Sequence, residues 1–375
     1  MSVPFLDLHA ANAPLEKAFL RELTRLYRAS AFIGGPEVER FEADFAAALG
    51  AARCVAVSSG TAAIELSLAA AGVGPGDEVI VPAFTFPGAA GPVLRLGARP
   101  VFADVRLEDG TLDPGAVKRV LSRKTRAVLA THLFGHPCDL DALRALTSSG
   151  GPKTKGAGPS ASGGIALIED AAQAHGGTWK GRALGSIGDF GGFSFYPTKN
   201  LGGIGDAGAI LVRRKGVADR LRRLRDHGQR ARFHPEEPGF NARMDALHAA
   251  FLRLKLPGLK GANARRAAIA ARYLRALEGN PSLVPLTPDA RGVSAWHAFV
   301  VRVSNRAAFA RRLDAAGIGH QVYYPKALPD LPVFGKAGGR YPAARELART
   351  ALALPLHPHL DAAAEARIHA VLAAF

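Results

Sequence analysis

Short apolar runs alternate with helix-length segments over much of this chain, and that alternation limits the fold more than any other feature. The runs lie at residues 53–57, 78–86, 99–105, 126–135, 165–170, 192–196 and 209–212. Each has the length of a buried strand, and most of the intervals are long enough for a crossover helix. Strands joined in this way form a parallel sheet with right-handed connections. The sequence therefore predicts an α/β fold with about seven mainly parallel strands wound with helices.

The pattern changes beyond about residue 257. An Arg- and Ala-rich helical segment is followed by expected strands at residues 296–303, 321–326 and 354–358, with fewer and more polar connections. This pattern predicts a smaller α+β domain. We therefore expect residues 1–256 to form an N-terminal arm and a large domain, and residues 257–375 to form a smaller C-terminal domain.

The composition is that of an ordinary globular protein. Hydrophobic residues make up 48% of the 375, which is enough to bury a large core. No apolar run is long enough to span a bilayer, and the first residues lack the pattern of a secretory signal, so we expect a cytoplasmic protein. Cys54 and Cys138 offer neither a disulfide framework nor the paired spacing of a metal site, and no metal is expected.

The formal charge of +16 raises one alternative, a DNA-binding regulator, because basic domains are typical of nucleic-acid binders. Much of this charge lies between Arg213 and Arg232, where nine Lys and Arg accompany two Asp. Leu221 and Leu224 recur among the arginines in the manner of an apolar helix stripe. A solvated helix face is therefore the simpler interpretation, and attraction of a nucleotide diphosphate is another.

A lysine follows the aromatic run at residues 192–196. Pro197 ends the expected strand, and Lys199 lies on the turn before the glycine-rich residues 202–205. A lysine held in a dry pocket loses its proton readily and becomes a nucleophile toward carbonyl groups. On a flexible surface loop the same residue would be an ordinary solvated charge, so its neighbours decide between the two interpretations.

A carboxylate at the end of another run favours the nucleophile. Asp170 ends the strand expected at residues 165–170, and the carboxyl edge of a parallel sheet is where ligands bind. Pyridoxal phosphate needs two such groups, an amine that bonds to its aldehyde and an acid that keeps its pyridine nitrogen protonated. The surrounding motifs, Glu169-Asp-Ala-Ala-Gln-Ala-His-Gly, Phe193-Ser-Phe-Tyr-Pro-Thr-Lys-Asn and Gly205-Asp-Ala-Gly, resemble the DegT/DnrJ/EryC1/StrS aminotransferases.

This resemblance implies fold type I of the pyridoxal-phosphate-dependent transferases and transamination of a nucleotide-linked keto sugar to an amino sugar. It implies glutamate as the amino donor. Lys199 is then the catalytic residue that binds the cofactor and moves the proton, and Asp170 is its acidic partner. Two alternatives within the family are a dehydratase, whose known members carry His at the position of Lys199, and an enzyme that forms an aromatic amine.

Further cofactor contacts follow from the residues and the resemblance together. Gly60 and Thr61 lie in a turn between a strand and a helix, where backbone N–H groups and the helix dipole favour anions. The family's phosphate contacts fall on the same residues. The resemblance also implies that the Phe86 ring stacks on the cofactor, that Gln173 contacts the cofactor ring and that Ser194 binds the phosphate.

The resemblance implies a homodimer in which two chains build each site. Asn241 is expected to cap a helix, and the matching asparagine of the family reaches the cofactor phosphate of the neighbouring subunit.

Substrate contacts are expected from His175, His297, Tyr323 and Lys326, although packing in the core or at an edge is the simpler explanation for any one of them. The Gly- and Ser-rich residues 147–164 are expected to form a surface insertion without a catalytic role.

Overall fold

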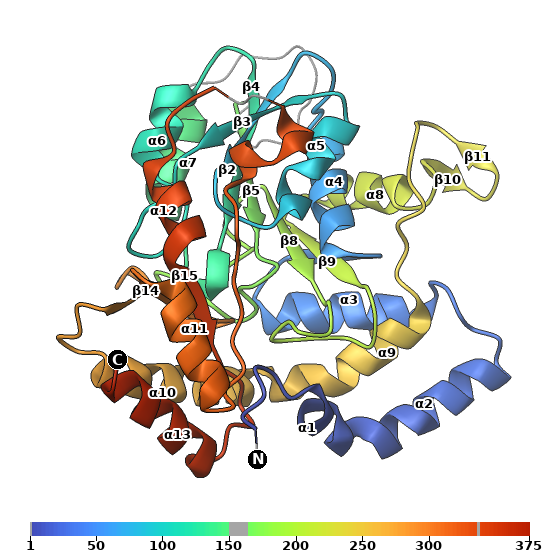
Figure 1. Cartoon of the computed structure of the whole chain (residues 1–375). Helices are drawn as coiled ribbons and strands as arrows, with labels where there is room; N and C mark the ends of the chain where they lie inside the picture. Colours follow the sequence, from blue (N-terminus) through green and yellow to red (C-terminus); the bar gives the residue numbers. More distant parts are fainter. Residues whose placement is uncertain (1, 150–163, 336–337) are drawn as a thin grey trace.

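The computed structural model describes residues 2–149, 164–335 and 338–375. Its centre is a sheet with the strand order β1-β9-β8-β5-β4-β2-β3 (Figure 1). The seven strands are β1 (Arg53–Val57), β2 (Glu78–Pro82), β3 (Arg99–Ala103), β4 (Thr125–Thr131), β5 (Ala166–Asp170), β8 (Phe190–Ser194) and β9 (Gly208–Val212). Only β9 runs antiparallel to its neighbours in this sheet. The predicted α/β fold with a mainly parallel sheet of seven strands is confirmed.

Helices cover both faces of this sheet, because side chains alternate between the faces along each strand. In β1, Val55 and Val57 join a core with α4, α5 and α8, whereas Cys54 and Ala56 join a core with α3, α6, α7 and α9. These helices are α3 (Pro36–Ala48), α4 (Gly60–Ala70), α5 (Gly91–Arg95), α6 (Pro114–Val120), α7 (Leu140–Ser149), α8 (Lys215–Leu224) and α9 (Ala246–Lys255).

The C-terminal part of the chain forms a three-stranded antiparallel sheet with a third core. The strands are β12 (Leu283–Pro285), β14 (Phe299–Val303) and β15 (Ala351–Leu354), and the helices of this core are α10 (Leu259–Ala276), α11 (Arg306–Ala315) and α13 (Ala362–Ala373). The buried apolar residues of α12 (Pro342–Thr350) instead join the core that contains α4. Val3 pairs with Ile318, so the start of the chain lies against this part. The arm continues through α1 (Leu8–Asn12) and α2 (Glu16–Arg28). The division at residue 257 stays a prediction.

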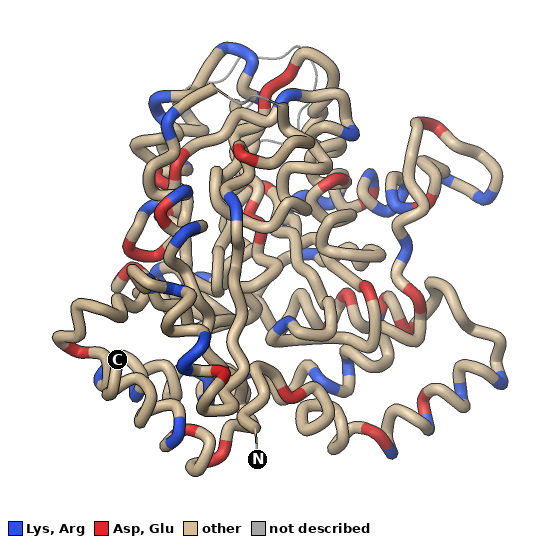
Figure 2. The backbone as a smooth tube through the Cα atoms, in the orientation of Figure 1, with Lys and Arg blue, Asp and Glu red and all other residues tan. Residues whose placement is uncertain are grey.

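The basic segment from Arg213 to Arg232 is largely charge-paired. It consists of α8 and one strand of the hairpin β10 (Gln229–Ala231) and β11 (His234–Pro235), with acidic residues alongside (Figure 2). Arg220 pairs with Glu237 at 2.9 Å, and Arg222 and Arg225 both pair with Glu42. Leu221 and Leu224 are buried, so the predicted amphipathic helix is confirmed.

Three local predictions were wrong. The strand expected at residues 354–358 lies earlier, as β15, which ends at Leu354. Asn241 does not cap a helix, because it pairs with Asp226 in an extended segment and α9 begins only at Ala246. Residues 321–326 do not form a strand, since only Gln321 pairs, with Ala353. Most of the predicted insertion at residues 147–164 lies outside the described residues. Within the described ranges, no helix is both long and apolar enough to cross a membrane.

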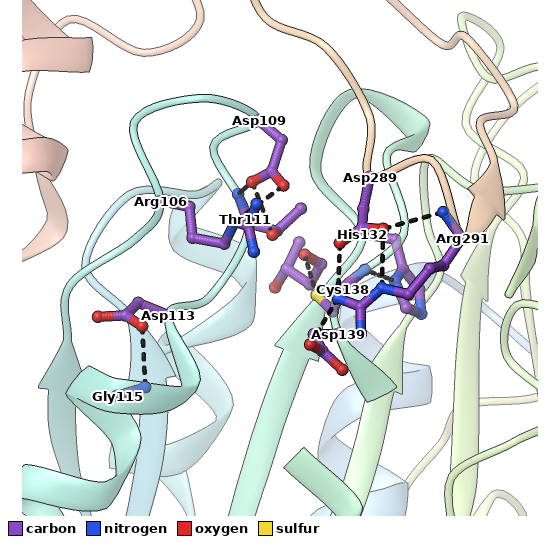
Figure 3. Close-up of polar contacts among 11 residues, drawn as sticks. Arg106, Asp109, Thr111, Asp113, Gly115, His132, Cys138, Asp139, Asp289 and Arg291 are labelled. Atoms are coloured by element: carbon purple, nitrogen blue, oxygen red, sulfur yellow. Dashed lines mark hydrogen bonds and ion pairs between the residues drawn. The ribbon is translucent and has the colours of Figure 1, made fainter. Parts of the chain in front are cut away.

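An arginine clamp joins the loop after β4 to the segment before β14. Arg291 donates to Asp139 and Asp289, each at 2.7 Å (Figure 3). Its guanidinium lies 4.7 Å from the centre of the Trp179 ring. Trp179 belongs to a small sheet of β6 (Thr178–Trp179), β7 (Arg182–Ala183) and β13 (Gly292–Val293). The clamp therefore ties three segments of the chain together near the carboxyl edge of the central sheet.

A buried carboxylate fixes that same edge of the sheet. Glu169 has no exposed surface and accepts hydrogen bonds from the backbone N–H groups of Gly185, Ile187 and Gly188. The Nε2 atom of His132 lies 2.9 Å from the Glu169 carboxylate. The Nδ1 atom of His132 accepts from the Cys138 N–H, so Nε2 carries the proton and donates it to Glu169. Burial alone would raise the pKa of Glu169, but His132 and these N–H groups lower it below its usual value.

We expect Glu169→Gln to lower the free energy of unfolding by about 3 kcal/mol, because an amide nitrogen would face N–H groups that now meet a carboxylate. Urea unfolding followed by circular dichroism measures the change. Glu108→Gln is the matched control, since Glu108 is exposed. Equal stability of the two variants would contradict this role of Glu169.

Candidate active site

Lys199 lies on a tight turn after β8. Its N–H donates to the Tyr196 carbonyl at 2.8 Å, and the Gly203 N–H donates to the Phe195 carbonyl at 2.7 Å. This turn carries the side chain into the protein, where burial lowers the pKa of the Lys199 amine to about 8, against an opposing effect of Asp170. A lysine with this pKa is neutral in a much larger fraction of molecules near physiological pH than an ordinary lysine is.

Asp170 ends β5 and is 9% exposed. Its two carboxylate oxygens accept only long hydrogen bonds, from the Thr131 hydroxyl at 3.3 Å and the Ala172 N–H at 3.2 Å. Burial raises its pKa, and the charge of Lys199 acts in the opposite direction. A carboxylate has about four acceptor positions. Asp170 therefore keeps acceptor capacity for a further cationic N–H group.

Two histidines share the surroundings of Lys199. His175 packs against the rings of Phe193 and Phe195, and burial together with the charge of Lys199 lowers its pKa to about 3. Burial and Lys199 likewise hold the pKa of His297 well below its usual value. Both imidazoles are therefore neutral near pH 7, and neither adds a positive charge to the site.

Asn200 ties the lysine turn to the C-terminal part of the chain. Its amide donates to the Ala295 carbonyl at 2.7 Å and to the Asn263 side chain at 2.9 Å, and its oxygen lies 3.2 Å from a ring nitrogen of His297. Asn263 in turn donates to the His175 carbonyl at 2.7 Å. One network of amides thus holds both histidines and the residue next to Lys199.

A narrow cradle lies at the start of α4. Ser59 caps this helix by accepting from the Ala62 N–H at 3.0 Å. The first N–H groups of a helix have no carbonyl partner within it, so those of Gly60 and Thr61 are suited to an anion. Gly60 lies against Ser194, where an added Cβ would come within 2.6 Å of the serine Cβ. The Thr61 hydroxyl would lie 3.0 Å from a Cβ at Gly88. Gly60, Thr61 and Ser194 are therefore brought together, as the sequence predicts, beside the positive end of a helix.

Aromatic rings border this site. Phe86 is 57% exposed, and its ring centre lies 6.1 Å from that of Tyr324. The Tyr324 hydroxyl accepts from the Gln173 amide at 3.3 Å, and the Gln173 oxygen accepts from the Phe134 N–H at 2.6 Å. Tyr323 is half-buried, and burial and the nearby Tyr196 raise its pKa. Phe86 is thus open to a flat ligand and is not a core residue.

Within the described ranges, the side chains of Lys326 and Asn241 form no hydrogen bond or ion pair with the other residues predicted for the site. Lys326 is exposed, and its charge acts on Asp330. Asn241 is exposed and accepts from Arg243 at 2.9 Å.

Thr131, His132 and Asn200 also take part in the site, although they were not among the residues predicted for it. Strand order offered a signal for the first two, because Thr131 pairs with Asp170 in the parallel register of β4 and β5. Asn200 had only its place next to Lys199 as a signal.

These groups fit pyridoxal phosphate. The cradle at Gly60 has the small residues and N–H groups that a phosphate needs, Asp170 has the acceptor capacity for a pyridinium N–H, and Lys199 supplies the amine. Among residues 2–149, 164–335 and 338–375, no group of three or more His, Cys, Asp or Glu side chains is arranged to hold a metal ion.

The chain is similar to known proteins over its whole length. It is 41% identical to the "Erythromycin biosynthesis sensory transduction protein EryC1" of Saccharopolyspora erythraea, over 100% of both chains. It is 41% identical to the "dTDP-3-amino-3,4,6-trideoxy-alpha-D-glucose transaminase" of Streptomyces venezuelae, over 96% of this chain and 92% of that protein.

A crystal structure of DesV from S. venezuelae in complex with a ketimine intermediate superposes with a TM-score of 0.93 and 39% identity, over 100% of this chain and 98% of that one. The model of the DegT/DnrJ/EryC1/StrS aminotransferase family matches residues 14–373. The fold, the motifs around Asp170 and Lys199 and these similarities agree: the chain belongs to the DegT/DnrJ/EryC1/StrS aminotransferase family.

Proposed function

We propose that this pyridoxal-phosphate-dependent aminotransferase transfers an amino group to a keto sugar carried by a nucleotide, with glutamate as the amino donor. The observation that carries the proposal is the buried pair of Lys199 and Asp170, each of which shifts the pKa of the other. The name of the S. venezuelae transaminase supports a nucleotide-linked sugar as the substrate. When bound, the cofactor supplies an electron sink that stabilises negative charge at the reacting carbon.

The residues of this chain would divide the work as follows. Lys199 would hold the cofactor covalently through its Nζ, and as a neutral amine this Nζ would take a proton from the reacting carbon and return it. Asp170 keeps a positive charge on the ring nitrogen, and Thr131 orients that carboxylate. Gly60, Thr61 and Ser194 bind the phosphate.

Phe86 and Gln173 fix the plane of the ring in this proposal. His175, His297 and Tyr323 contact the substrate, and Lys326 does so at the exposed margin of the site.

The alternatives have less support. A dehydratase of this family would carry His where this chain has Lys199. A DNA-binding regulator would need free cations, whereas Arg220, Arg222 and Arg225 are paired with carboxylates. Formation of an aromatic amine would use the same cofactor groups, and a substrate panel separates it from sugar amination.

The complete site is proposed to need two chains. Asn241 is exposed and apart from Lys199 in its own chain, which suits a residue that binds the phosphate in a neighbouring subunit. Exposed apolar side chains on α2 and after it, including Leu20, Tyr27 and Ile33, offer a surface for a homodimer. A cytoplasmic location remains a prediction.

Lys199→Ala should abolish covalent capture of pyridoxal phosphate and lower multiple-turnover transamination by about a thousandfold or more. Borohydride reduction followed by peptide mass spectrometry measures capture. In the unaltered protein the capture rate should rise with pH through about 8, because the neutral amine is the nucleophile. Lys124→Ala, at an exposed lysine, is the control. Capture at another lysine would contradict the assignment.

Gly60→Ala should weaken pyridoxal phosphate binding by about tenfold or more, because the new Cβ would meet Ser194 at 2.6 Å and close the cradle. Absorbance titration measures the Kd. Gly216→Ala is the matched control, since a Cβ there meets nothing within 4 Å. Unchanged affinity of the Gly60 variant would place the phosphate elsewhere.

Mixing Lys199→Ala and Asn241→Ala chains, after joint unfolding and refolding, should restore about a quarter of the activity of the unaltered protein, because half of the dimers then contain one intact site. Each variant alone should be nearly inactive. No recovery from a mixture that forms heterodimers would show that both residues serve the same chain's site.

A further inference from the structure

A cavity of about 450 Å³ lies beside the lysine turn, and Lys199 is one of the residues that line it. Its walls come from the N-terminal arm, from the turn at residues 197–200, from the junction of α9 and α10, and from residues 357–359 after β15. The arm contributes mainly apolar side chains, among them Leu6, Leu8 and Leu15. The volume lies toward the small end of ligand pockets, which span roughly 300 to 1,000 Å³.

Two cations on α9 and α10 line this cavity without a carboxylate partner. Lys255 donates to the Asn12 side chain at 2.8 Å and to the Gly202 carbonyl at 2.9 Å, which uses two of its three N–H groups on neutral oxygens. Arg266 is 5% exposed, donates to the Leu356 carbonyl and leaves its buried Nε without a hydrogen bond. Neither forms an ion pair with any carboxylate of the described residues.

The electrostatics of the cavity favour an anion. Burial and the nearby Arg266 lower the pKa of Lys255 to about 8, and burial lowers the pKa of Arg266 to about 10. A buried cation is costly unless a counter-charge reaches it. A third cation in the wall, Arg265, already forms an ion pair with Glu365 at 3.1 Å. Asp7 also lines the cavity, but its carboxylate caps a helix by accepting from the Ala10 N–H. Asp7 therefore offsets only part of the charge.

Uncharged donors complete the lining. His357 and His359 border the cavity, and burial lowers the pKa of both, that of His357 to about 4. Near neutral pH they are neutral imidazoles that can each offer one N–H. This lining suits a small organic acid. The two unpaired cations and the neutral N–H donors can bind its carboxylate, and the apolar side chains of the arm can contact its carbon chain.

We propose that Lys255 and Arg266 bind a carboxylate group of the amino donor, a small dicarboxylic amino acid, next to Lys199. This inference rests on the proposed aminotransferase function, since it assigns the donor to a subsite of the same centre. The nucleotide sugar would then approach from the exposed side, where Phe86 and Tyr196 lie.

Binding is tested without turnover by titrating the pyridoxal-phosphate-loaded protein with glutarate, a dicarboxylate that has no amine to transfer. We expect calorimetry to show glutarate binding that Lys255→Gln weakens by about tenfold or more and that Lys255→Arg largely retains. Lys260→Gln is the matched control, because it removes an exposed lysine from α10 and should leave the Kd unchanged. Arg266 is left intact because its bond to the Leu356 carbonyl helps to hold the fold.

Inorganic phosphate is titrated in parallel. If phosphate binds with the same dependence on Lys255 and glutarate does not bind, the cavity is a phosphate site and the proposal is overturned. Equal glutarate affinity of Lys255→Gln and the unaltered protein also overturns it.

The two half-reactions separate this proposal from the proposed function. Lys255→Gln should raise the glutamate concentration needed for half-maximal amination of the cofactor by about tenfold, whereas the pyridoxamine-phosphate-loaded variant should aminate the keto sugar at a rate close to that of the unaltered protein. Equal slowing of both half-reactions would contradict a donor subsite. If the unaltered, loaded protein aminates no keto sugar at all, the sugar assignment fails while the glutarate result still stands.

Discussion

The arrangement of this active site depends on two adjacent carboxylates at the end of β5 that face opposite ways. Glu169 points into the protein, where three backbone N–H groups and His132 hold it. That attachment fixes the strand end and leaves Asp170 directed at the ligand edge with few partners of its own. The many hydrogen bonds of Glu169 thus hold the strand end in place, so that Asp170 can remain buried with few hydrogen bonds of its own although burial of a charge is unfavourable.

Burial of the ionisable groups makes Lys199 reactive, but the same burial lowers the stability of the folded chain. The environment that makes Lys199 a neutral nucleophile raises the pKa of Asp170 and holds His175 and His297 uncharged. The amides of Asn200 and Asn263 compensate in part, because they tie the lysine turn to α10 and to the segment before β14. The catalytic turn is therefore held from both the central sheet and the C-terminal part of the chain.

The sequence was sufficient for the sheet and for the lysine turn, because buried strands, glycines and Pro197 are local signals, whereas the grouping of Gly60 with Ser194 followed from the family resemblance. Asn241 shows where such signals fail: a residue that caps helices well by itself pairs with Asp226 instead, and only tertiary contacts decide between the two. His132 and Glu169 were missed as a pair because 37 residues separate them and their contact exists only through the register of β4 and β5. The unpaired state of Lys255 and Arg266 is likewise a property of the folded chain.

The exposed rings at the border of the site have a consequence for redesign. Phe86 and Tyr196 are both more than half exposed, and Tyr196 takes part in the lysine turn only through its backbone, whose carbonyl accepts from the Lys199 N–H. A mutant library at Tyr196 would sample new acceptor shapes at little risk to folding, since exposed side chains tolerate exchange far better than bonded interior ones. At Phe86, which is proposed to stack on the cofactor, the library would be limited to aromatic side chains. Substrate preference can diverge in nature in the same way, through changes in the exposed residues at the border of the site while the buried residues around Lys199 and Asp170 stay the same.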